Sequence, residues 1–178
     1  MTEDEKNKSI KIKLTIEPAS ALARGKIINQ AALLESVMDI YISRHFSKEP
    51  IRQLEMIELI LSSSRITFEN KRQVFKFLVD KYEPEFAKRN KSYANDLDTL
   101  NRQRNIFAHY PLNVAIEANE LFEKHRTISF IKFKNATALE IYNEKKIDQY
   151  LKLFNKMITQ IIELIEKQPD TPSPSPTT

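Results

Sequence analysis

The sequence of 178 residues is long enough for one domain with a buried core, and its 41% hydrophobic and 29% charged residues are typical of globular proteins. A single glycine excludes the Gly-rich loops that bind nucleotide phosphates, and it favours long helices. The absence of cysteine excludes disulfides, thiolate metal sites and cysteine nucleophiles, and it is compatible with a reducing cytosol.

The charge and the N-terminal region bear on location and partners. Residues 1–8 are polar with no apolar run behind them, so we expect no signal peptide. No stretch approaches the ~20 apolar residues that cross a bilayer, so we expect a cytoplasmic protein with no membrane partner. The formal net charge of +4 suits a polyanionic partner, although it is mild for a chain of this size.

The first predicted element is a short β-strand. Apolar and polar residues alternate from 9 to 17, which is the period of a strand. The apolar members are Ile10, Ile12, Leu14 and Ile16. We expect Pro18 to end the strand, so residues 1–18 are predicted to form an N-terminal arm.

Four helices are expected next, because apolar residues recur there every three or four positions. Their predicted limits are 19–46, 51–61, about 68–82, and about 93–108 or beyond. Proline or serine residues end each of the first three helices. The residues predicted to face inward on the second and third helices are Leu54, Ile57, Leu61, Val74, Phe77, Leu78 and Lys81.

Residues 128–142 alternate again around a polar run, which predicts a β-hairpin to which the N-terminal strand is a candidate addition. A final helix is expected over about 146–166, and the Pro-, Ser- and Thr-rich residues 168–178 should be disordered. The predicted fold is mainly α: an up-and-down bundle of four to five helices over 19–167, with a small β-hairpin inserted before the last helix.

The strongest candidate for chemistry is the run Arg-Asn-Ile-Phe-Ala-His over residues 104–109, at the end of the fourth helix. The chain has three histidines, His45, His109 and His125, and none has zinc-ligand spacing to another ligand. A serine elbow flanked by glycines is also absent, so acyl hydrolysis has no support. We therefore expect no metal and no cofactor.

This run resembles the signature of the HEPN family, an Arg followed after four to six residues by a His, often written Arg-Asn-x-x-x-His. The alanine before the histidine and the position late in a long helix also match. The resemblance implies a HEPN-like bundle and a homodimer that brings two motifs into one cleft. It also implies a metal-independent endoribonuclease with a toxin, phage-defence or RNA-processing role, and an antitoxin or regulatory protein as partner.

In such an enzyme, His109 would take the proton from the ribose 2′-OH, since imidazoles titrate near neutrality. Arg104 would bind phosphate oxygens and stabilise the phosphorane, and Asn105 would orient either group. The product would be a 2′,3′-cyclic phosphate. The alternative is a non-catalytic HEPN-fold module, regulatory or scaffolding, that binds protein or nucleic acid.

Helix geometry raises a question about this site. A separation of five residues at ~100° each places Arg104 about 140° around the helix from His109. Asn105 lies near the face of His109, and so does Arg102, which satisfies the six-residue version of the pattern. Either the helix loosens near His109, or the long Arg104 side chain reaches round, or a second subunit completes the site.

Other residues are supporting candidates. Glu35 and Asp39 lie one turn apart on the first helix, and acidic residues there face the motif in HEPN-like bundles, so one of them could hold Arg104 or His109. A solvated polar edge is the alternative for this pair. Tyr110 directly follows the histidine, one residue before the position of a modified tyrosine in a HEPN variant, so that role is not carried over.

The motif residues also have purely structural interpretations. His109 could be a buried or capping side chain that closes the helix before Pro111. Arg104 could form a surface ion pair with a carboxylate such as Asp98 or Glu117.

Overall fold

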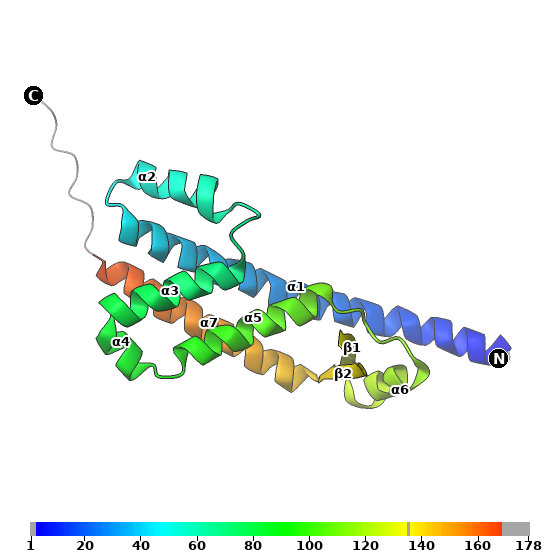
Figure 1. The fold of residues 1–178 in the computed structure, drawn as a ribbon. Coiled ribbons are helices and arrows are strands. Elements are labelled where there is room, and N and C mark those ends of the chain that lie inside the picture. Colours follow the sequence, from blue (N-terminus) through cyan, green and yellow to red (C-terminus); the bar gives the residue numbers. More distant parts are fainter. Residues whose placement is uncertain (1–2, 135, 169–178) are drawn as a thin grey trace, which may run out of the picture. The chain divides into compact units, whose positions relative to one another are not determined.

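The computed structural model describes residues 3–134 and 136–168. Over these residues it has seven α-helices, one π-helical segment and a two-stranded antiparallel sheet before the last helix (Figure 1). This confirms a mainly helical fold with a small β-hairpin in the predicted place. The predicted tail lies outside the described residues except for Gln168.

The elements in chain order are α1 (Glu3–Phe46), α2 (Pro50–Glu55), the π-helical η1 (Met56–Leu61), α3 (Phe68–Tyr82), α4 (Pro84–Arg89), α5 (Tyr93–His109), α6 (Ile116–His125), β1 (Ile128–Lys134), β2 (Ala136–Tyr142) and α7 (Glu144–Lys167). The chain divides into two compact units. The hairpin unit comprises Met1–Gln30 and Arg102–Leu153, and the helical unit comprises Ala31–Asn101 and Phe154–Thr178.

The strand predicted over residues 9–17 is wrong, because the chain is helical from Glu3 and continues so through Pro18. From Ile16 onward, the buried side chains of α1 recur at steps of four, three and four residues, as on the inner face of a helix. They are Ile16, Ser20, Ala23 and Ile27. The burial of this stripe favours a helix, although the alternation of apolar and polar residues over 9–17 is typical of a strand. Pro18 removes one backbone hydrogen bond but does not end the helix.

The hairpin unit has an aromatic core that fixes the hairpin against α5. The ring of Phe107 lies 5.0 Å from that of Phe130 and 4.8 Å from that of Tyr142, both edge-on. The Tyr142 hydroxyl donates a buried hydrogen bond of 2.7 Å to Oε1 of Gln103. β1 and β2 pair from Ile128 opposite Tyr142 to the far end of the hairpin, as the alternation predicted.

The helical unit has its core between apolar faces of its own helices. The buried side chains there include Leu34, Met38, Tyr41, Ile42, Phe75 and Leu78 from α1 and α3, together with Leu97, Leu100, Phe154 and Ile161 from α5 and α7. The inward face predicted for α3 is partly wrong: Leu78 is buried, but Val74 and Phe77 are 40% and 61% exposed. Leu54, predicted to face inward, is also exposed.

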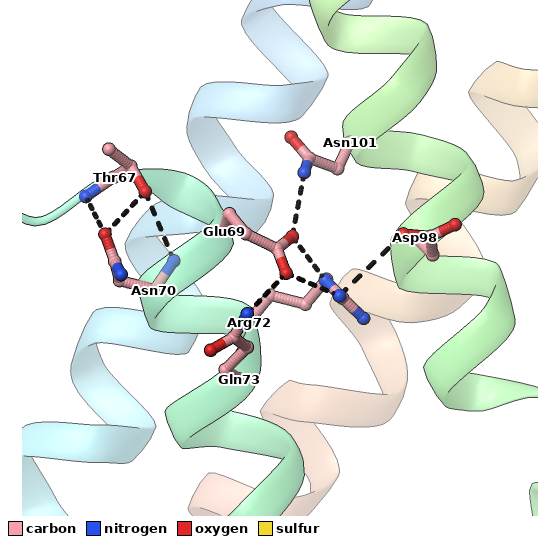
Figure 2. A network of polar contacts seen from close by, with 7 residues as sticks. All are labelled: Thr67, Glu69, Asn70, Arg72, Gln73, Asp98 and Asn101. Carbon is pink, nitrogen blue, oxygen red and sulfur yellow. Dashed lines mark hydrogen bonds and ion pairs between the residues drawn. The ribbon is translucent and has the colours of Figure 1, made fainter.

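A polar network centred on Glu69 links α3 to the helical unit's part of α5 (Figure 2). The Glu69 carboxylate accepts two hydrogen bonds from Arg72, at 2.8 and 2.6 Å, and others from Gln73 and Asn101. The hydrogen bond from Arg72 is the main reason why the pKa of Glu69 is lowered to about 2. Arg72 also lies 3.8 Å from Asp98.

Candidate functional site at the end of helix α5

The motif lies on the last turns of α5, within the hairpin unit. The helix stays regular to its end, since the Tyr110 amide donates to the Ile106 carbonyl at 3.1 Å. The helix therefore does not loosen near His109. Ile106 and Phe107 are buried in the core, whereas His109 is exposed and Arg104 is half-buried.

The exposed arc of α5 contains the motif side chains in a definite order. At ~100° per residue, Ala108 and Asn105 lie between Arg104 and His109 around the helix. The Arg104 Nη1 donates to Oδ1 of Asn105 at 3.0 Å, so the guanidinium is held on the side that leads to His109. The long arginine thus reaches partly round the helix, and the small Ala108, which is exposed, separates the two ends of the arc.

Arg24 of α1 holds the end of α5, and sequence analysis did not identify it. Its guanidinium donates to the carbonyl of Phe107 and, at 2.5 Å, to that of Tyr110. It also lies 4.6 Å above the ring of Phe130. The last carbonyls of a helix have no intrahelical donors and carry partial negative charge, so a cation is well placed there. Burial lowers the pKa of Arg24.

The chain after His109 is bound to the hairpin. The Ile131 amide donates to the Pro111 carbonyl at 2.9 Å, and the Asn113 amide donates to the Ser129 carbonyl at 2.8 Å. β1 therefore pairs with β2 along one edge and with residues 111–113 along the other. The predicted hairpin is consequently attached directly to the helix end that carries the motif.

Arg102 has a separate partner. Its Nη2 lies 2.9 Å from the Glu140 carboxylate on β2, and Lys132 approaches the same carboxylate at 4.0 Å. The hydrogen bond to Glu140 raises the pKa of Arg102. Arg102 is therefore tied to the hairpin, two turns before His109 on the same face of the helix.

Glu35 and Asp39 belong to the helical unit, and both form ion pairs with Lys71 of α3. Each carboxylate lies 2.7 Å from the Lys71 ammonium, whose side chain is only 3% exposed. Asp39 is buried, so the solvated-edge interpretation is wrong for it. Its second oxygen, Oδ1, has no hydrogen-bond partner within the described part of the chain.

Burial also shapes the protonation of this cluster. Burial raises the pKa of Asp39, against the opposing effect of the hydrogen bond from Lys71. Burial by itself would lower the pKa of Lys71, but its bonds to Asp39 and Glu35 outweigh that effect and the pKa is raised. The cluster is thus an ion triad in which Lys71 and Asp39 are buried and Glu35 is partly exposed, and the lysine that completes it was not identified from the sequence.

The contacts around the motif bear on its purely structural interpretations. His109 is exposed rather than buried, and the cation at the helix end is Arg24. Arg104 donates a hydrogen bond to Asn105, whereas Asp98, one of the carboxylates suggested as its ion-pair partner, lies next to Arg72.

Within residues 3–134 and 136–168, no group of three His, Asp or Glu side chains is arranged to hold a metal ion. None of the described helices is both long and apolar enough to cross a membrane.

Comparisons with known proteins give no further guidance. No family model, no curated protein and no solved structure matches the chain.

Proposed function

We propose that this chain is a metal-independent endoribonuclease that acts as a homodimer, in a toxin, phage-defence or RNA-processing role. The observation that supports it most is the exposed arc at the end of α5. There, an exposed His109 and an Arg104–Asn105 pair share the solvent-facing side of a helix end that Arg24 holds in place. The resemblance of residues 104–109 to the HEPN signature supports the same reaction.

The proposed chemistry assigns one task to each side chain. His109 accepts the proton of the ribose 2′-OH while the 2′-oxygen attacks phosphorus. Arg104, held by Asn105, binds two of the phosphate oxygens and stabilises the charge of the phosphorane. The bond from phosphorus to the 5′-oxygen breaks, leaving a 2′,3′-cyclic phosphate and a 5′-hydroxyl.

The dimer supplies the group that one copy lacks. The leaving 5′-oxygen needs a proton, and the motif of one chain contains a single histidine. In a two-fold dimer, His109 of a second copy would face the same phosphate and deliver that proton. The small, exposed Ala108 in the middle of the arc allows the two helix ends to approach closely.

The test is cleavage of tRNA, rRNA and mRNA in EDTA by wild type, by His109→Ala and by the matched control His45→Ala. We expect cyclic-phosphate fragments from wild type and from the control. The His109→Ala variant should be slower by about 100-fold or more, because general acid–base groups typically contribute 10²–10⁴-fold. Circular dichroism and sedimentation should show that the variant keeps its fold and its oligomeric state.

Two results would decide against this function. Equal cleavage by wild type and His109→Ala would place the activity elsewhere or in a contaminant. No cleavage of any RNA by freshly purified wild type would favour the non-catalytic binding or scaffolding module instead.

A further inference from the structure

The hairpin has a second face whose apolar side chains are exposed. Side chains alternate along a strand, and Phe130 and Tyr142 point into the core. The apolar residues on the opposite face, here called the outer face, are Ile131, Phe133, Leu139 and Ile141. Phe133 is 73% exposed, Leu139 50% and Ile141 47%. An aromatic side chain this exposed, on a face that also exposes Leu139 and Ile141, is typical of a contact surface.

The outer face continues into an open hollow of about 710 Å³, called here the basic hollow. Ile141 lines both. Its lining also includes His125 at the end of α6, and Lys145, Lys146 and Gln149 at the start of α7. None of the described residues that line the hollow carries a carboxylate.

The basic side chains that line the basic hollow differ in how firmly they are held. Lys146 donates to the Ile141 carbonyl at 2.7 Å and lies 4.4 Å from the centre of the Tyr142 ring, so it is fixed against the hairpin. Lys145 and His125 are exposed. The hollow thus combines one fixed ammonium with two groups that can adjust to a ligand.

A second hollow in the same unit serves as a comparison. It has a volume of about 610 Å³, and its lining includes Glu144 and Asp148 as well as Lys26 and Arg126. Its charges have both signs, which does not suit a polyanion. The basic hollow has only cations and neutral groups, and it therefore fits phosphate.

We propose that the outer face and the basic hollow together bind single-stranded RNA, with a base stacked on Phe133 and phosphates beside Lys145 and Lys146. This inference rests on the proposed function and names the form of its substrate. Unpaired bases stack on exposed aromatic side chains whatever their sequence, and lysines beside them neutralise the backbone. The carboxamide of Gln149 can form hydrogen bonds with a base edge.

The connection to the motif supports this route. β1 pairs along its other edge with residues 111–113, which directly follow His109. A strand of RNA that crosses the outer face therefore lies on the element to which the end of α5 is attached. The surface would hold nucleotides on one side of the cleaved bond.

The experiment measures the affinity of the full chain carrying His109→Ala, in EDTA, for a fluorescent oligouridine, by anisotropy at several salt concentrations. Adding Lys145→Glu should weaken binding by about tenfold and flatten the slope of log Kd against log salt by about 0.7 per lost phosphate contact. Adding Phe133→Ala should weaken binding by about fivefold or more and leave that slope unchanged. The matched control Lys152→Glu, an exposed lysine of α7 outside the hollow, should change Kd by less than about twofold.

The outcomes separate this inference from the proposed function. If both variants bind like their parent while wild type still cleaves RNA, the inference is wrong and the nuclease stands. If both variants lose affinity but wild type cleaves nothing, the binding surface stands and the nuclease is wrong. If Phe133→Ala abolishes self-association in sedimentation and leaves RNA affinity unchanged, the outer face is a protein contact and the inference is overturned.

Discussion

The contact between Arg24 and the end of α5 leads to the most informative mutation. Arg24→Met keeps the length of the side chain but removes its donors to the carbonyls of Phe107 and Tyr110. It also removes the cation that lies 4.6 Å above the Phe130 ring. The last turn of α5 would then expose carbonyls that no other part of the helix can satisfy.

The size of the effect can be estimated from these contacts. A hydrogen bond from a charged donor contributes about 1.5–3 kcal/mol, and a cation–π contact contributes about 0.5–1 kcal/mol. Burial of the guanidinium, which lowers the pKa of Arg24, costs free energy that is recovered when the arginine is removed. We therefore expect a net loss of about 3 kcal/mol in the free energy of unfolding, less than the sum of the separate contacts.

Urea unfolding followed by circular dichroism measures this loss, and hydrogen exchange locates it. The Tyr110 amide, bonded to the Ile106 carbonyl, should lose protection in Arg24→Met. RNA cleavage should fall by more than the folded fraction falls, because Arg24 positions the turn that carries His109. The control Lys26→Met, an exposed residue of the same helix, should change stability by less than about 0.5 kcal/mol.

Arg24 does not hold the end of α5 if Arg24→Met unfolds within about 0.5 kcal/mol of wild type and keeps the protection of the Tyr110 amide. Such a result would mean that solvent satisfies these carbonyls as well as the guanidinium does.

Three further predictions concern stability, each measured by urea unfolding. Lys71→Met leaves the buried Asp39 without its cation and should lower the free energy of unfolding by about 3 kcal/mol near neutral pH. The loss should become smaller in acid, because the Asp39 carboxylate is then protonated. The control Lys76→Met, at an exposed ion pair, should lower the free energy of unfolding by less than about 1 kcal/mol. Glu69→Gln should cost about 1 kcal/mol near neutral pH; because the folded pKa is depressed to about 2, the difference should vanish as the pH falls from about 5 towards 2. Pro18→Ala should raise the free energy of unfolding by about 1–3 kcal/mol, since it restores a helical amide donor. An unchanged free energy of unfolding would contradict a helix α1 that continues through residue 18.

Those parts of the fold that depend on local pattern could be predicted from the sequence. The limits of α3 agree with the predicted 68–82, because Thr67 caps its start and Pro84 follows its end. The hairpin agrees because its alternation reflects one face packed on Phe107. In both cases the signal lies within about 15 consecutive residues, which is the range of periodicity arguments.

Elements whose identity depends on distant contacts were missed or misassigned. The N-terminal alternation favours a strand, whereas the burial of Ile16 in step with Ile27 is typical of the helix that the structure shows. α6 was not predicted, and only three of its ten side chains are buried. The exposed Val74 and Phe77 show the same limit, since spacing alone could not decide which stripe of α3 faces the core.

In the candidate site, too, residues that are neighbours in the sequence could be predicted, whereas a residue that acts through a distant contact could not. Arg104, Asn105 and His109 were found because they are neighbours in the sequence, and the chemistry they suggest depends on residue type and spacing. Arg24 acts on the same turn from more than 80 residues away, and its only signal was a charge on the stripe that also contains the buried Ile27. A sequence with the motif but without such a donor would carry the same reactive groups on a less ordered turn. Because phosphoryl chemistry requires groups held within fractions of an ångström, the motif alone is a weaker predictor of activity than the motif together with Arg24.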